Sequence, residues 1–186
     1  MKKKLYCYSY QEFIDMMEKL NWKEKPANGF STISITSELD DEPKHYFNDN
    51  IKNNINLNFN DVSPTMWWGN EDYYDKAFEL YQDFNDLDNL YFNFVSDVFD
   101  TKINLHSMNY SEAFKLCKFI DKNIKEGNNI FVHCSAGASR SQGVVRYILD
   151  TYPEIEWETR DENPCLTPNY HVVRMLKRAF RYLNKN

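Results

Sequence analysis

The sequence predicts an α/β domain with a central, largely parallel sheet flanked by helices, and three observations support this. Short segments that are apolar, or in which apolar and polar residues alternate, are followed along the chain by longer segments of helical periodicity. This order is expected when helices connect parallel strands. A chain of 186 residues can bury one full core without disulfides or metal. No internal repeat or low-complexity linker divides the chain, so we expect residues 1–186 to form one domain.

The first part of the chain predicts a strand, a helix and two further strands. Residues 5–10 form a short apolar run, and residues 11–20 carry apolar side chains at helical spacing. Residues 30–36 and 55–59 each alternate apolar with polar side chains, which is the pattern of a strand. We therefore expect three strands and one helix in this part.

The middle of the chain predicts two helices, an extended segment and a buried strand. Residues 71–84 place aromatic and alanine side chains on one face of a helix, and residues 90–95 form an extended piece. A second helix is expected over residues 111–124. Gly127 should end it, because glycine readily adopts the left-handed conformation of a helix C-terminus. Residues 130–132 then form a short buried strand.

Two more helices are expected after that strand. The first begins near Ser139 and buries an apolar face against the strand. The second is expected to begin with Thr167 as its N-cap and Pro168 as its first residue, since both residue types favour those positions. Its apolar stripe consists of Val172, Leu176, Ala179 and Leu183.

The chemistry is concentrated where the strand at residues 130–132 meets the next helix. Cys134 stands at the strand end, and five residues separate it from Arg140. Those five residues are small: Ser135, Ala136, Gly137, Ala138 and Ser139. The backbone amides of such a loop can curl around an anion without obstruction by side chains. The N-terminus of the following helix favours negative charge at the same point.

This setting suits a phosphoryl group and a thiol nucleophile. A thiol beside a helix N-terminus and a cationic side chain ionises readily, which makes Cys134 the candidate nucleophile. The planar guanidinium of Arg140 can hold two phosphoryl oxygens bidentately, which a lysine could not do. Gly137 is expected to supply a backbone conformation or a close approach to phosphate that a Cβ would obstruct.

The motif His133-Cys134, five small residues, Arg140-Ser141 resembles the signature of the cysteine-dependent protein tyrosine phosphatase superfamily, in its compact dual-specificity form. The resemblance implies hydrolysis of phosphomonoesters through a phosphocysteine intermediate, without a cofactor or a metal ion. It implies phosphotyrosine in a protein or peptide as the substrate, with phosphoserine and phosphothreonine as further substrates. It also implies that His133 orients the loop by hydrogen bonds to its carbonyls and that Ser141 hydrogen-bonds the thiolate.

The resemblance extends to a bacterial and phage group of predicted tyrosine phosphatases. In that group three further motifs occur in the same order as here: Ile33-Ser34-Ile35, Phe59-Asn60-Asp61-Val62 and Thr167-Pro168-Asn169. The chain departs from the group in an aromatic-rich insertion at about residues 63–102. Within it, Trp67-Trp68-Gly69 is a candidate lip for a substrate ring, beside the interpretation that these side chains belong to the core.

The general acid that protonates the leaving oxygen is left open among three aspartates. In the superfamily this residue is an aspartate on a mobile loop. The Phe-Asn-Asp-Val motif and the strand before it favour Asp61, which we take as the first candidate. The usual spacing in dual-specificity members favours Asp97 or Asp100 instead.

The composition indicates which kinds of partner and which cellular compartment to expect. The net charge of −6 disfavours a general nucleic-acid or membrane-surface binder. The chain starts without an apolar run long enough for a signal peptide, and its four cysteines lack metal-binding spacing, so we expect reduced thiols in a cytoplasm. Cys117 is expected in the core. Cys7 and Cys165 could form a disulfide with an oxidised Cys134, although two ordinary thiols are the preferred interpretation.

Other functions stay open at the level of the sequence. Compact members of the superfamily also act on RNA 5′ phosphates, nucleotides or phosphoinositides. A catalytically weak phosphate-binding module is an alternative from a different class, because the general acid is unsettled. The presence of Cys134, Arg140 and Ser141 together favours the enzyme.

Overall fold

The computed structural model describes part of the chain. For two short strands it describes the backbone alone. The described residues are 3–21, 28–37, 40, 53–61, 93–96, 103–158 and 167–185. Of these, 93–96 and 103–106 are described by backbone only. The helix predicted at 71–84 and the Trp67-Trp68-Gly69 segment lie outside the described residues.

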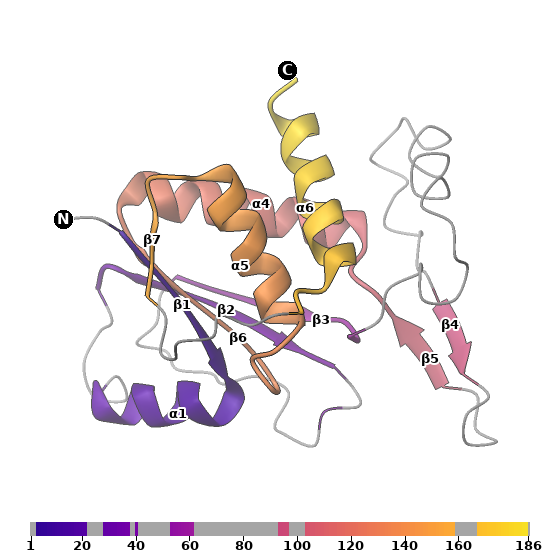
Figure 1. The fold of residues 1–186 in the computed structure, drawn as a ribbon, viewed down its shortest axis with the longest axis horizontal. Coiled ribbons are helices and arrows are strands. Elements are labelled where there is room, and N and C mark those ends of the chain that lie inside the picture. The colour runs from indigo at the N-terminus through magenta and orange to yellow at the C-terminus, as the bar shows by residue number, and fades with distance from the viewer. Residues whose placement is uncertain are drawn as a thin grey trace.

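A five-stranded parallel sheet forms the centre of the described fold (Figure 1). Its strands lie in the order β3-β2-β6-β1-β7, and every neighbouring pair is parallel. Their bounds are β1 (Lys4–Ser9), β2 (Phe30–Thr36), β3 (Asn54–Asn58), β6 (Asn129–Cys134) and β7 (Glu156–Trp157). Open α/β sheets bind ligands beyond the carboxyl ends of their parallel strands, and β6 ends there in the middle of the sheet.

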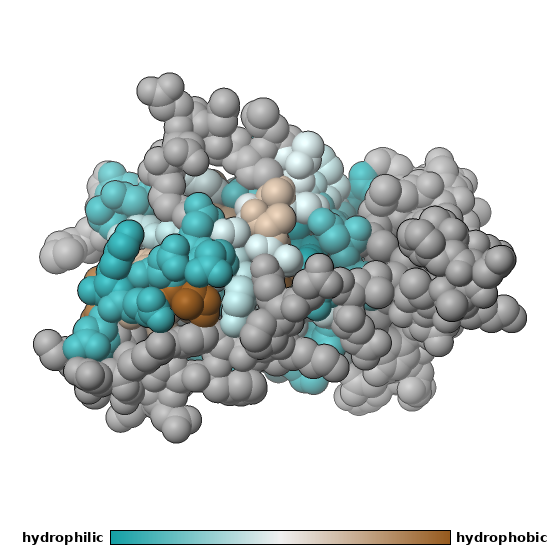
Figure 2. Space-filling view, turned by 90° about the horizontal axis from the view of Figure 1, so that it is seen from below, coloured by the Kyte–Doolittle hydropathy of each residue, from teal (hydrophilic) through white to brown (hydrophobic). Residues whose placement is uncertain are grey.

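Helices cover both faces of this sheet (Figure 1). One face carries α1 (Tyr10–Lys19), and the other carries α4 (Tyr110–Glu126), α5 (Arg140–Thr151) and α6 (Tyr170–Leu183). The larger hydrophobic core lies between the sheet and the three helices. A smaller core under α1 contains Tyr8, Phe13, Met17 and Phe131. Figure 2, seen from the α1 side, shows a hydrophilic surface over α1 with a small apolar spot.

A second sheet has two antiparallel strands, β4 (Asn93–Ser96) and β5 (Ile103–His106). β4 overlaps the extended segment expected at residues 90–95, whereas the sequence did not predict β5. Among the described residues, no helix combines the length and apolar character needed to cross a membrane.

Local sequence explains where the helices begin and end. Ser9 and Glu12 form a capping box at the start of α1, in which each side chain accepts a hydrogen bond from the other residue's backbone amide. Asn109 and Glu112 form the same box at α4. Gly127 ends α4 with a φ of 82°, which confirms the predicted C-terminus.

Most of the predicted elements agree with the structure. The strands expected at 5–10, 30–36, 55–59 and 130–132 correspond to β1, β2, β3 and β6. The helices expected at 11–20, at 111–124 and after Ser139 correspond to α1, α4 and α5. The two-residue strand β7 was not predicted, because two residues are too few to show a period.

The predicted start of the last helix is wrong. Thr167 is not the N-cap and Pro168 is not the first helical residue, because α6 begins at Tyr170. Asn169 is the N-cap, and its side-chain oxygen accepts a hydrogen bond from the amide of Val172 at 3.2 Å. Asparagine caps helices at least as well as threonine does, and Pro168 precedes the cap.

His171, in the first turn of α6, makes stability depend on pH. Its ring is 1% exposed, and its Nε2 lies 2.9 Å from the carbonyl oxygen of Met108. Burial lowers the pKa of His171 to about 4; the hydrogen bond to Met108 opposes this shift, and the charges of Arg174 and Arg178 add to it. Between about 4 and the usual value of 6.5, the unfolded chain therefore binds more protons than the folded chain.

We expect the free energy of unfolding to fall as the pH drops from 6.5 toward about 4. The contribution of His171 is about 2 kcal/mol between about pH 7.5 and about pH 5. Denaturant unfolding at both pH values measures it, with His171→Gln as the comparison. Glutamine offers an amide donor to Met108 but does not titrate, so the variant should lose this part of the pH dependence. The same pH dependence in both proteins would contradict the assignment.

Candidate functional site

Cys134 ends β6 and Arg140 begins α5, so a five-residue loop joins the central strand to a helix. Cys134 is 3% exposed, and its Sγ lies 3.1 Å from the Oγ of Ser141. The thiol therefore faces the first turn of α5, whose backbone amides have no acceptor within the helix. A hydroxyl at this distance can donate to a thiolate, which is the contact expected of Ser141.

Hydrogen bonds to the loop carbonyls orient its peptide groups. The accepting carbonyls are those of Ser135, Gly137 and Ser139. Their donors are, in the same order, Tyr10 N at 2.9 Å, Gln142 Nε2 at 3.2 Å and Gly143 N at 2.9 Å. In a planar trans peptide the next N–H points opposite to the carbonyl. The amides of Ala136, Ala138 and Arg140 therefore point away from these surrounding elements, which is the orientation that an anion-binding loop needs.

Gly137 fits closely against the junction of β1 and α1. Its φ is 70°, a conformation that residues with a side chain rarely adopt. A Cβ at this position would lie 2.6 Å from the amide nitrogen of Ser9 and 2.7 Å from the carbonyl carbon of Tyr8. The need for glycine, predicted from the sequence, thus follows from both the backbone conformation and the support beneath the loop.

Arg140 is buried in the site and makes an ion pair that was not predicted from the sequence. Arg140 is 5% exposed. Its Nη1 and Nη2 donate to Oδ2 and Oδ1 of Asp40 at 3.1 and 2.9 Å, and Nη1 also donates to the carbonyl oxygen of Phe59 at 3.2 Å. Its Nε is buried and makes no hydrogen bond to any residue that the structure describes.

Asp40 is held in place by its own turn as well as by the arginine. Its Oδ2 accepts a hydrogen bond from the amide of Ser37 at 2.6 Å, and its amide donates to the carbonyl of Ser37 at 3.2 Å. A signal for this residue does exist in the sequence. Asp40 follows the strand predicted at 30–36, and the carboxyl ends of parallel strands meet at one edge of a sheet.

Arg140 keeps its positive charge although its side chain is buried. Burial lowers the pKa of Arg140, but the hydrogen bond to Asp40 and the charges of Cys134, Asp40 and Asp61 raise it. The net shift is upward, so the guanidinium keeps its positive charge beside the thiol. The site therefore combines a fixed cation with a buried sulfur.

Asp61, the first candidate for the general acid, lies at the loop. Its Oδ1 accepts hydrogen bonds from the Oγ of Ser139 at 2.7 Å and from the Nδ2 of Asn169 at 2.8 Å. Both of these donors contact Oδ1 rather than Oδ2. The alternatives, Asp97 and Asp100, lie outside the described residues, so the choice among the three stays a prediction.

His133 packs under the loop through its ring. The imidazole stacks on Phe13 with 4.2 Å between ring centroids, and it lies 5.9 Å from the ring of Tyr10 at a tilt of 55°. It is 1% exposed. These contacts tie the residue before Cys134 to α1, which also supports the loop through the amide of Tyr10.

The other described cysteines differ in position and environment. Cys117 lies in the core, as predicted, and burial raises its pKa to about 11. Cys7 pairs with Val132 in the sheet register, two residues before Cys134, so the two cysteine Cα atoms are roughly 8 Å apart. A disulfide needs about 7 Å or less, so Cys7 could bridge to Cys134 only if the backbone moved. Cys165 lies outside the described residues.

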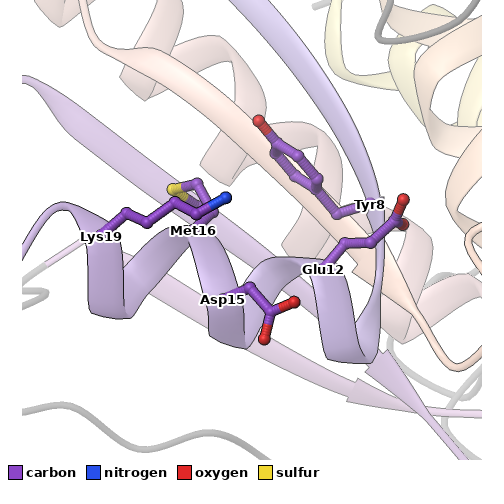
Figure 3. A pocket seen from close by; sticks show the side chains of 5 residues that line it. All are labelled: Tyr8, Glu12, Asp15, Met16 and Lys19. Carbon is purple, nitrogen blue, oxygen red and sulfur yellow. The ribbon is translucent and has the colours of Figure 1, made fainter.

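Two further features of the described residues do not add chemistry to the site. No group of three His, Cys, Asp or Glu residues is placed to hold a metal ion within the described ranges. A shallow pocket beside α1 is lined by Tyr8, Glu12, Asp15, Met16 and Lys19 (Figure 3). Two of its carboxylates already serve the helix, since one caps α1 and the other accepts from Gln11.

No family model and no curated protein matches the chain. The geometry of the loop and its neighbours is therefore what indicates a function.

Proposed function

We propose that the chain is a cysteine-dependent phosphatase with the dual-specificity phosphatase fold, acting on phosphotyrosine in proteins or peptides. Phosphoserine and phosphothreonine are further substrates of the same chemistry. The observation that carries the proposal is the hydrogen bonding of Arg140, next to the thiol of Cys134.

An arginine side chain has five N–H donors: one on Nε and two on each Nη. Asp40 and Phe59 accept three hydrogen bonds from Arg140, two from Nη1 and one from Nη2. The donors left are the one on Nε and the second one on Nη2, which lie side by side on one edge of the guanidinium. A pair of parallel donors matches two oxygens of a phosphoryl group. A buried unsatisfied donor is costly, so an anion at this edge would be bound favourably.

The proposed reaction has two steps. In the first, the thiolate of Cys134 attacks phosphorus, an S–P bond forms, and the P–O bond to the leaving group breaks. Asp61 donates a proton to the departing oxygen. In the second, Asp61 takes a proton from a water molecule that attacks phosphorus, the S–P bond breaks, and inorganic phosphate leaves. The hydroxyl of Ser141 stabilises the thiolate that is released.

Replacing Asp61 with asparagine should separate substrates by their leaving groups. We expect kcat for a phosphoester with a poor leaving group, such as an alkyl phosphate, to fall roughly 10²- to 10⁴-fold. The rate with 4-nitrophenyl phosphate should fall much less, because its leaving group needs no proton. Steady-state kinetics with both substrates measure the difference, and equal losses for both would move the role to another residue.

The proposed function is tested by hydrolysis of a small aryl phosphate without added metal, followed by a substrate panel. The panel contains phosphotyrosine, phosphoserine and phosphothreonine peptides, an RNA with a 5′ phosphate, a nucleotide and a phosphoinositide. We expect turnover of the aryl phosphate and fastest turnover of the phosphotyrosine peptide. Tight phosphopeptide binding without any turnover would overturn the proposal in favour of a binding module. Fastest turnover of the RNA or the lipid would overturn the substrate assignment.

A further inference from the structure

Asn169 connects three parts of the site through three different groups. Its backbone amide donates to the carbonyl of Ser139 at 3.1 Å, its Nδ2 donates to Oδ1 of Asp61 at 2.8 Å, and its Oδ1 accepts from the amide of Val172 at 3.2 Å. The residue is 8% exposed. One side chain thus caps α6 and holds the carboxylate of Asp61 at the same time.

The backbone of Asn169 is fixed by close contact with α5. A Cβ on Gly143, in the first turn of α5, would lie 2.7 Å from the carbonyl oxygen of Asn169. Only a residue without a side chain lets the two helices approach this closely. Since Ser139 belongs to the loop and Gly143 lies in the first turn of α5, Asn169 is placed relative to the loop as well as relative to its own helix.

We propose that Asn169 is a positioning residue that orients the carboxyl group of Asp61 for proton transfer. The inference rests on the proposed function, because it gives Asp61 the role of the acid. With Oδ1 engaged by Asn169 and Ser139, the rotation of the carboxyl group is restricted and Oδ2 is the oxygen that transfers the proton. The same contacts make the amide end of Asn169 necessary for the reaction and the oxygen end necessary for the helix.

One substitution can separate the role of the side-chain nitrogen of Asn169 from the role of its side-chain oxygen. Asn169→Ser keeps a good N-cap, since serine caps helices about as well as asparagine, but it removes the donor to Asp61. We expect a melting temperature close to that of the wild type and an unchanged KM. We expect kcat for an alkyl phosphate to fall roughly 10- to 100-fold, because small misplacements of a reacting group have effects of this size. The rate with 4-nitrophenyl phosphate should change little.

A matched control is Asn184→Ser at the other end of α6. Asn184 is exposed there, and its Nδ2 donates to the carbonyl of Phe180. This substitution removes an amide donor of the same kind far from the loop, so both substrates should be hydrolysed at wild-type rates. A loss equal to that of Asn169→Ser would show that the helix, not the contact with Asp61, is responsible, and would overturn the inference.

The decisive experiment is a double-mutant cycle of Asn169→Ser and Asp61→Asn, followed with the alkyl phosphate. If Asn169 acts through Asp61, Asn169→Ser should cost activity in the wild-type background and nothing further in the Asp61→Asn background. Additive losses would overturn the inference while leaving the proposed function intact. Absence of turnover in the wild type, with either substrate, would overturn the proposed function and the inference with it.

Discussion

Replacing Cys134 with serine is expected to lower kcat for an aryl phosphate by roughly 10⁴-fold or more. The hydroxyl stays protonated at neutral pH, so no nucleophile of thiolate strength faces the phosphorus. The variant changes one buried atom, and the loop, Arg140 and Ser141 stay in place. We therefore expect inorganic phosphate to bind the variant, which calorimetry can measure beside the steady-state rates.

Cys117→Ser is the matched control for this change. Cys117 also lies buried, but its Sγ contacts the hydroxyl of Tyr147 and the carbonyl of Leu176 in the core, away from the loop. This variant should turn over substrate at close to the wild-type rate when corrected for its folded fraction. Wild-type turnover by Cys134→Ser would contradict the assignment of the nucleophile.

Replacing Arg140 with lysine is expected to lower kcat/KM by roughly 10³-fold. An ammonium group supplies charge but not two parallel donors, and it cannot hold Asp40 and a phosphoryl group along two edges at once. The loss should therefore appear in kcat as well as in KM, because the transferring phosphoryl group loses its orientation. Steady-state kinetics with an aryl phosphate, together with thermal unfolding, measure both effects.

Arg146→Lys provides the comparison on the same helix. Arg146 is exposed and pairs with Asp150 at 3.0 Å, one turn along α5. An exposed pair of this spacing contributes only about 0.3–0.5 kcal/mol, so activity and stability should both stay close to those of the wild type. Equal kinetics for Arg140→Lys and Arg146→Lys would contradict the role of Arg140 as the phosphate-binding cation.

The individual strands and the loop could be predicted because their signals are local. Residues 30–36 show period-two alternation, and β2 has the predicted bounds. Only five residues separate Cys134 from Arg140, so the sequence itself places both residues at the junction of β6 and α5. Neither inference needs knowledge of how distant segments meet.

Asp40 could not be predicted with the same ease, because its partner is 100 residues away along the chain. It stands in an acidic stretch, where a carboxylate ordinarily faces solvent. Only the strand order β2-β6 brings it to Arg140. Sheet order is a property of the whole fold, which the alternation of a single strand does not contain.

The start of α6 was predicted wrongly for a related reason. Thr167 and Pro168 match local preferences for a helix start, but Asn169 is held by Ser139 and Asp61 as well as by its own helix. Contacts from two other segments fix the cap at Asn169. Tertiary contacts thus overrode a local preference at the residue that joins α6 to the site.

The most direct test of the proposed mechanism is to trap the intermediate on Cys134. The wild-type protein is mixed with an aryl phosphate, quenched in acid within the first turnovers, digested and analysed by mass spectrometry. The proposed mechanism predicts one added phosphoryl group on the peptide that contains Cys134, and none in the Cys134→Ser variant. Substrate turnover with no phosphoryl group on Cys134, or with the group on another residue, would contradict it.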